Sequence, residues 1–139
     1  MRDTRIVSMS EFSEWLHSRP ICPVAAILFV GDRFSCCDEA VLIEENGCVY
    51  GAATIAPQGE QGSNGTPAIV GLYVVPGARG LGYGTELMRA TVERCRERGF
   101  TRVHVDAMST GTKKAIARLP EDLRAMLEVK DLGNVLDRF

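Results

Sequence analysis

Apolar residues recur along the chain with two different spacings, and these spacings predict both strands and helices. Near the start, residues 4–8 suit a short strand, and Ser10 suits the N-cap of a helix that runs to about Ser18. The apolar residues of this helix share one face: Phe12, Trp15 and Leu16. The next stretch, Ile21 to Phe34, is apolar and fits a buried helix or a strand, because periodicity alone does not separate the two.

The middle of the chain is typical of a β-hairpin followed by a further strand. Residues Ala40 to Glu44 and Cys48 to Ala56 have strand composition, and Asn46-Gly47 between them is the strongest short-range signal for a hairpin turn. Residues 58–67 contain three glycines and predict a loop. Ala68 to Val75 is a continuous apolar run, as expected for a central strand that is covered on both faces.

After Pro76 the spacing of apolar residues becomes helical. The apolar face of this helix is formed by Leu87, Met88, Thr91, Val92 and Cys95. Gly99 suits the left-handed residue that ends a helix. Residues 102–108 then alternate as in a strand, with His104 and Asp106 together on the face opposite to the apolar side chains.

The last part of the chain, Thr112 to Phe139, has a helical pattern with breaks at Pro120 and Gly133. The order strand, helix, hairpin, strand, helix, strand, helices predicts a mixed α/β fold around one sheet. Neither a repeat nor a linker divides the sequence, so we expect residues 1–139 to form a single domain.

Composition excludes several classes of protein. The 139 residues are 45% apolar and 24% charged, with a net charge of −2. This charge balance does not indicate the basic surface of a nucleic-acid-binding protein. The longest mostly apolar stretch is too short to span a bilayer, and the first residues do not resemble a signal peptide. The five cysteines are odd in number and lack C-x2-C spacing, which disfavours a disulfide framework or a zinc site. We therefore expect a cytoplasmic protein without a metal, membrane or nucleic-acid partner.

The segment Val74 to Met88 carries the clearest chemical signal. It leads from a buried strand through a turn with four glycines directly into an amphipathic helix. The start of a helix offers unpaired N–H groups and the positive end of the macrodipole, and glycines let this backbone approach a phosphate closely. The pattern is neither a P-loop, since no Lys follows Gly82 or Gly84, nor a dinucleotide fingerprint, since the glycines are spaced Gly80-x-Gly82-x-Gly84. Two interpretations of this segment remain open at this point: a turn without function, or a phosphate-binding loop assisted by Arg79.

Residues Arg79 to Gly84 resemble the R/Q-x-x-G-x-G/A signature of the GNAT acetyltransferases. Residues 72–76 are similar to the fourth strand of that family, and Leu87-Met88 to the start of its third helix. The resemblance spans about Ala40 to Ser109. It implies a mixed sheet whose fourth and fifth strands splay apart, flanked by helices, with acetyl-CoA bound in the crevice between them.

The resemblance also implies which residues bind acetyl-CoA. The backbone of the fourth strand would hold the pantetheine arm at Leu72, Tyr73 and Val74. The loop would hold the pyrophosphate at Arg79, Gly80, Leu81, Gly82, Tyr83, Gly84 and Thr85. A backbone N–H near Val74 would stabilise the oxyanion of acyl transfer, an effect on the order of a few kcal/mol.

Transfer of an acetyl group to an amine requires that the amine lose a proton. Relatives that acetylate ribosomal proteins use a glutamate on the fifth strand, and His104 occupies the matching position here, with Asp106 as its partner or as an alternative base. His104 also fits a simple packing role. The family's later Asn and Tyr are replaced by Ser109 and Ile116, so no general acid is assigned.

The sequence departs from the family pattern after Ser109, where the usual final hairpin is missing. We expect a helix from residue 120 onward to replace it and to cover the open sheet edge, within its own subunit or across a homodimer. The sequence thus predicts an acetyl-CoA-dependent N-acyltransferase whose acceptor is an amine of a small molecule or a protein. A non-catalytic acyl-CoA-binding or sensor module is the alternative.

Overall fold

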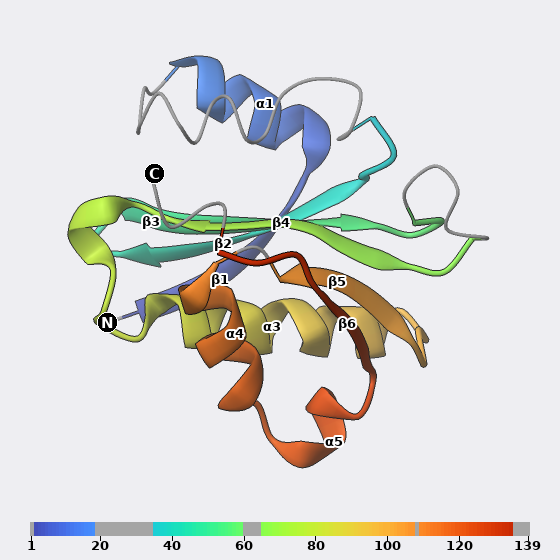
Figure 1. Ribbon diagram of the computed structural model, residues 1–139. Coiled ribbons are helices and arrows are strands. Elements are labelled where there is room, and N and C mark those ends of the chain that lie inside the picture. Colours follow the sequence, from blue (N-terminus) through green and yellow to red (C-terminus); the bar gives the residue numbers. More distant parts are fainter. Residues whose placement is uncertain (1, 19–34, 60–64, 108, 135–139) are drawn as a thin grey trace.

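The strands of the protein form one sheet through the centre of the molecule. The computed structural model describes residues 2–18, 35–59, 65–107 and 109–134, of which 15–18 are described by their backbone alone. Within these residues the sheet has six strands in the order β1-β2-β3-β4-β5-β6 (Figure 1). Neighbours from β1 to β4 are antiparallel, whereas β4, β5 and β6 are parallel. The strands are β1 Arg2–Ser8, β2 Glu39–Glu45, β3 Cys48–Ala56, β4 Ala68–Val74, β5 Val103–Ala107 and β6 Leu127–Asp131.

Helices cover the two faces of the sheet unequally. Helix α1 lies on one face, and α3, α4 and α5 lie on the other (Figure 1). The helices are α1 Met9–Ser18, α3 Tyr83–Glu97, α4 Thr110–Ala117 and α5 Glu121–Arg124, and the short 3-10 helix η2 is Pro76–Ala78. The stretch Ile21 to Phe34, which fitted a helix or a strand, lies outside the described residues.

Two apolar cores follow from this layering, one on each face. The α1-side core contains Phe12 and Leu42, and the α3-side core contains Ile43 and Met88, all of them at most 1% exposed. Because successive residues of a strand point to opposite faces, β2 supplies both cores from neighbouring positions. The five predicted apolar residues of the second helix are all buried in α3, which confirms its amphipathic pattern.

Local signals account for the ends of several elements. Asn46 and Gly47 both have positive φ, 54° and 79°, as a tight hairpin turn requires. Gly99 has a φ of 86° and ends α3, and the N–H of Phe100 donates to the carbonyl of Cys95 as in a Schellman motif. The predicted N-cap of α1 was wrong by two residues. The hydroxyl of Ser8, not Ser10, accepts the N–H of Glu11 at 3.2 Å.

The C-terminal part differs most from the expectation. A helical pattern with breaks at Pro120 and Gly133 was predicted from Thr112 onward, but after α4 and α5 the chain forms the strand β6, which pairs in parallel with β5. Leu123 of α5 is 2% exposed and anchors this turn in the α3-side core. The predicted covering of the sheet edge by this segment is therefore confirmed, but a strand and not a helix covers it. The open N–H and C=O groups of β5 are better partners for an extended segment than for a helix.

A bulge in β4 separates the centre of the sheet into two halves. Thr54 of β3 pairs with Gly71 and Ile55 pairs with Ile69, so Val70 is an extra residue on β4. The alternation of side chains changes accordingly: Val70 packs in the α1-side core, whereas Leu72 and Val74 pack with the α3-side core. Beyond the bulge β4 diverges from β5, with which it pairs only through Ala68 and Ile69. The expected splay of these two strands is thus present.

Candidate functional site

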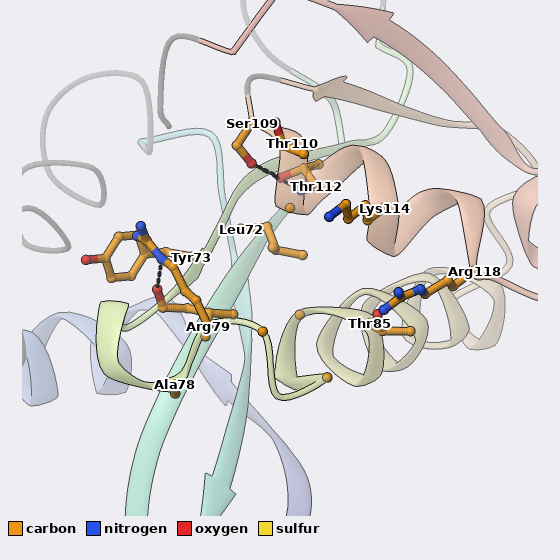
Figure 2. A pocket seen from close by; sticks show the side chains of 15 residues that line it. Leu72, Tyr73, Ala78, Arg79, Thr85, Ser109, Thr110, Thr112, Lys114 and Arg118 are labelled. Carbon is orange, nitrogen blue, oxygen red and sulfur yellow. Dashed lines mark hydrogen bonds between the residues drawn. The ribbon is translucent and has the colours of Figure 1, made fainter. Parts of the chain in front are cut away.

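The divergence of β4 and β5 opens a crevice of about 480 Å³ on the α3 side of the sheet. One wall is the end of β4 with the loop that follows it, and the other is the first turn and outer face of α4 (Figure 2). Volumes of this size are typical of sites for small organic ligands. None of the described residues that line it carries a carboxylate, so the crevice suits an anionic ligand.

The start of α3 forms the floor of this crevice. Gly82 is its N-cap residue with a φ of 88°, and no side chain caps the helix. Gly80 also has a positive φ, 82°. The two glycines let the loop turn sharply into the helix, and no side chain among the described residues caps its first N–H groups. An anion is the natural partner of such a helix end.

Arg2 of β1 braces the loop from outside the crevice. Its guanidinium donates to the carbonyl oxygen of Leu81 at 2.5 Å and to Glu86 at 2.9 Å. It also lies 4.0 Å from the ring centre of Tyr83 and 3.7 Å from Glu45. An edge strand distant in sequence therefore holds the loop through Arg2, a residue that no sequence motif had indicated.

The loop's own arginine holds it to β4. The Nε of Arg79 donates to the carbonyl oxygen of Val74 at 2.9 Å, and its guanidinium lies 5.2 Å from the ring centre of Tyr73 (Figure 2). Arg79 therefore keeps its charge at the mouth of the crevice while it fixes the turn after β4.

Eight of the ten residues predicted to bind the cofactor line the crevice: Leu72, Tyr73, Val74, Arg79, Gly80, Gly82, Gly84 and Thr85. The other two do not. The side chain of Leu81 is 57% exposed outside it, and Tyr83 is 6% exposed and stacks on Tyr50. The hydroxyl of Tyr83 hydrogen-bonds to Glu45, and this bond together with burial raises the Tyr83 pKa. The Tyr83 side chain thus supports the loop from behind.

His104 and Asp106 lie close together but away from this lining. The Nε2 atom of His104 is 2.7 Å from Oδ1 of Asp106. Their neighbours Val103, Val105 and Ala107 belong to the α3-side core, so this pair faces the opposite side of β5. If the neutral ring donates Nε2–H to the carboxylate, Nδ1 is left to accept a proton.

The wall formed by α4 was missed by sequence reasoning. It contributes Ser109, Thr110, Gly111, Thr112, Lys114 and Arg118. Ser109 is the N-cap of α4, and its hydroxyl accepts the N–H of Thr112 at 3.1 Å. The sequence does contain a helix cap, Ser109 followed by Thr112, and basic side chains at positions 114 and 118. Nothing local to this segment indicates that it lies opposite the glycine loop.

Ile116 and Cys95 are candidates for a chemical role by position or by residue type, but both pack in the α3-side core. Ile116 is 8% exposed in the α3-side core, so it packs where the family often has a tyrosine. Cys95 is fully buried, and burial raises the pKa of its thiol to about 12. Such a thiol is a poor nucleophile. Cys48, by contrast, is exposed at the hairpin.

Comparison with known proteins connects this site to a family. Residues 6–119 match the model of the Acetyltransferase (GNAT) family. A search of characterised proteins found no significant match. None of the helices in the described part of the chain is long and apolar enough to cross a membrane.

Solved structures share the fold at low sequence identity. A ribosomal-protein-alanine N-acetyltransferase from Brucella melitensis biovar Abortus 2308 is 17% identical, with a TM-score of 0.55, over 86% of this chain and 92% of that one. A GCN5-related N-acetyltransferase from Ralstonia eutropha JMP134 is 18% identical, with a TM-score of 0.57, over 85% and 90%. The aminoglycoside N-acetyltransferase AAC(6')-Iy in complex with CoA is 18% identical, with a TM-score of 0.56, over 85% and 90%.

Proposed function

The chain belongs to the GNAT acetyltransferase family, and from that premise we propose that it is an acetyl-CoA-dependent N-acetyltransferase, with residues 1–139 acting as a single domain. The observation that carries this proposal is the crevice itself. It joins the side of β4 that β5 leaves to a helix start without a side-chain cap, and no carboxylate of the described part of the chain lines it. These features match a ligand with a hydrogen-bonding arm and a pyrophosphate.

Each wall of the crevice has a part in binding. The backbone of Leu72 to Val74 would pair with the amide groups of the pantetheine arm, because β5 no longer occupies that side of β4. The first N–H groups of α3, between Gly82 and Thr85, would hold the pyrophosphate, with Arg79 adding positive charge. When bound, acetyl-CoA supplies the acetyl group as a thioester.

The acceptor amine would approach from the face of β5 that carries His104 and Asp106. An amine of ordinary basicity is protonated near pH 7 and must lose a proton before it attacks. Asp106 orients the imidazole through their 2.7 Å contact, and His104 would accept that proton directly or through water. The acceptor would be an amine of a small molecule or of a protein.

The proposal is tested by a charge change at Thr85, whose side chain lines the crevice in the first turn of α3 (Figure 2). A carboxylate there favours the free helix through the macrodipole, so Thr85→Glu should fold normally. It would repel the pyrophosphate, and we expect the affinity for acetyl-CoA to fall by roughly tenfold or more relative to Thr85→Gln. Calorimetric titration of both variants measures this. Equal affinities of the two variants, or no binding by the wild type, would contradict the proposal.

A non-catalytic acyl-CoA-binding or sensor module is the second candidate. It is favoured by one observation: His104 and Asp106 do not line the crevice, and Ile116 offers no proton donor. Release of free CoA thiol from acetyl-CoA in the presence of a panel of amines distinguishes the two. Binding without any release supports the sensor, and release that depends on the amine supports the enzyme.

A further inference from the structure

Strand β6 is the last strand of the sheet within the described residues, so no described strand lies beside its outer edge. Two exposed apolar side chains belong to this region: Val129 is 47% exposed and Leu132 is 39% exposed. A sheet edge with open backbone groups and exposed apolar side chains can pair with another extended segment. The backbone and the charges of β6 indicate which segment fits it.

The backbone groups on the outer edge of β6 alternate with those that bind β5. The carbonyl of Met126 accepts the N–H of Val103, and the N–H of Leu132 donates to the carbonyl of Ala107, both at 2.9 Å. Since every second residue of a strand bonds to the same neighbour, the even-numbered residues of β6 bond to β5. The N–H and C=O groups of the odd-numbered residues point outward, and these residues are Leu127, Val129 and Asp131.

The charges of β6 are complementary to a second copy of the same strand. An antiparallel copy centred on Val129 brings Glu128 opposite Lys130 of the second copy, and Lys130 opposite Glu128 of the second copy. Among the described residues no carboxylate forms an ion pair with Lys130, whereas the exposed Arg102 binds Glu128. A second copy would thus supply the carboxylate that Lys130 lacks.

The backbone and the charges select the same register. Opposite residues of an antiparallel pair alternate between hydrogen-bonded and non-hydrogen-bonded pairs, and side chains are closer in the latter. With Val129 at the centre, the outward-facing residues form the hydrogen-bonded pairs, and Glu128 and Lys130 form the closer ones. A shift by two residues in either direction would place Glu128 opposite Glu128 or Lys130 opposite Lys130, which is destabilising.

We propose that two copies of this chain form a two-fold symmetric dimer through antiparallel pairing of their β6 strands. The two sheets join into one, and every hydrogen bond and ion pair of the interface occurs twice. The two-fold axis passes between the two Val129 residues, perpendicular to the sheet. The His104–Asp106 pairs of both copies therefore lie on the same face of the joined sheet, which also carries Glu128 and Lys130. The dimer goes beyond the proposed function and does not depend on it.

The charges are tested by sedimentation equilibrium, which gives the dissociation constant of the dimer. Lys130→Glu would place two carboxylates opposite each other, and Glu128→Lys two ammonium groups. Each variant alone should raise the dissociation constant roughly tenfold or more. In an equal mixture of the two variants, both pairs again have opposite charges, and a heterodimer should form about as tightly as the wild-type dimer.

The backbone is tested with Val129→Pro. The N–H of Val129 faces outward, so proline removes hydrogen bonds of the dimer and leaves those between β6 and β5 in place. This variant should be monomeric and still show cooperative thermal unfolding. Arg89→Glu is the control, because it makes the same charge change as Lys130→Glu on the exposed surface of α3. It should leave the dissociation constant of the dimer unchanged.

Three results would overturn the inference. The first is a wild type that stays monomeric at every protein concentration. The second is a mixture of Lys130→Glu and Glu128→Lys that does not associate more tightly than either variant alone, which would exclude this register. The third is a dimer that Val129→Pro leaves intact, or that Arg89→Glu weakens as much as Lys130→Glu does. None of these results bears on acetyl-CoA binding, so the proposed function is tested separately.

Discussion

At the scale of single residues, the structure shows side chains that act on the glycine loop without touching the crevice. Arg2 binds the carbonyl oxygen of Leu81 and neutralises Glu86, a carboxylate in the first turn of α3. Without this arginine, the loop loses a brace and Glu86 loses its ion-pair partner in the first turn of α3. Arg2 can thereby affect the affinity of the crevice for its ligand, although Arg2 itself does not line the crevice.

Removal of this brace should weaken cofactor binding. Arg2→Ala should raise the dissociation constant of acetyl-CoA roughly fivefold, in line with the loss of a charge-assisted hydrogen bond. Arg5→Ala is the matched control, since it breaks a similar β1–β2 ion pair with Glu44 at 2.7 Å that is remote from the loop. Titration of both variants decides the matter, and equal effects of the two would show that only the stability of β1 is involved.

The pair His104 and Asp106 makes a separate prediction about turnover. If His104 takes the proton of the acceptor, His104→Ala should lower kcat by roughly 10² or more and leave the affinity for acetyl-CoA unchanged. Asp106→Asn should have a smaller effect in the same direction, because it loosens the imidazole and does not remove it. Unchanged turnover of His104→Ala would make this histidine a packing residue.

The cysteines allow a test of burial that is independent of any ligand. Burial raises the pKa of Cys95 to about 12, and the thiolate is the reactive form. We expect iodoacetamide at pH 8 to modify the exposed Cys48 in the native protein and to modify Cys95 only after unfolding in urea. Peptide mass spectrometry reports both sites in one sample. Native modification of Cys95 at a rate similar to that of Cys48 would contradict the packing described for α3.

At the scale of elements, the bulge at Val70 and the strand β6 decide what the sheet can do. The bulge turns the end of β4 away from β5 and opens the crevice. Strand β6 covers the other side of β5, so the splay does not leave β5 with two open edges. The sheet can open between β4 and β5 and remain stable because β6 of the C-terminal segment pairs with the other edge of β5.

Deletion of the residues after Leu119 should expose this edge. The truncated protein should form larger particles in light scattering, because the unpaired groups of β5 become available to other chains. Leu123→Ala is the control that retains β6. It should lower the free energy of unfolding by about 2–4 kcal/mol through the cavity it creates, without aggregation below its unfolding temperature. A soluble truncated protein of unchanged particle mass would show that β6 is dispensable.

At the scale of the whole molecule, one sheet carries both cores, and ion pairs connect α3 to β2. Arg94 and Arg98 near the end of α3 bind Asp38 and Glu39 at the beginning of β2. At the other end of the same helix lies the glycine loop. Since α3 is tied to the sheet at both ends and packs on its centre, we expect the cofactor site and the core to unfold together.

This coupling predicts one transition in thermal unfolding. Differential scanning calorimetry should give a single peak, and acetyl-CoA at about 100 times its dissociation constant should add roughly 2.7 kcal/mol of stability. For a domain of this size the midpoint should then rise by roughly 5–15 °C. Two resolved peaks, of which only one moves with acetyl-CoA, would show that the proposed single domain consists of separable parts.

The sequence by itself determined the features whose causes lie within a few residues. The turn at Asn46-Gly47, the end of α3 at Gly99 and the glycine loop before α3 were all predicted, because positive φ favours Gly and Asn wherever it is required. The apolar face of α3 was predicted as well, since it follows from helical spacing alone. The similarity of the loop to the GNAT signature then pointed to the family that the comparison confirmed.

Only the tertiary structure decided the features that depend on partners distant in sequence. The extra residue at Val70 is defined by its pairing with β3, and residues 127–131 form a strand because the edge of β5 is available, although their short apolar pattern also fitted a helix. Lys114 and Arg118 line the crevice only because packing places α4 opposite the start of α3. Local spacing limits the conformations of a segment, but the free energy of pairing and burial selects which neighbour it meets.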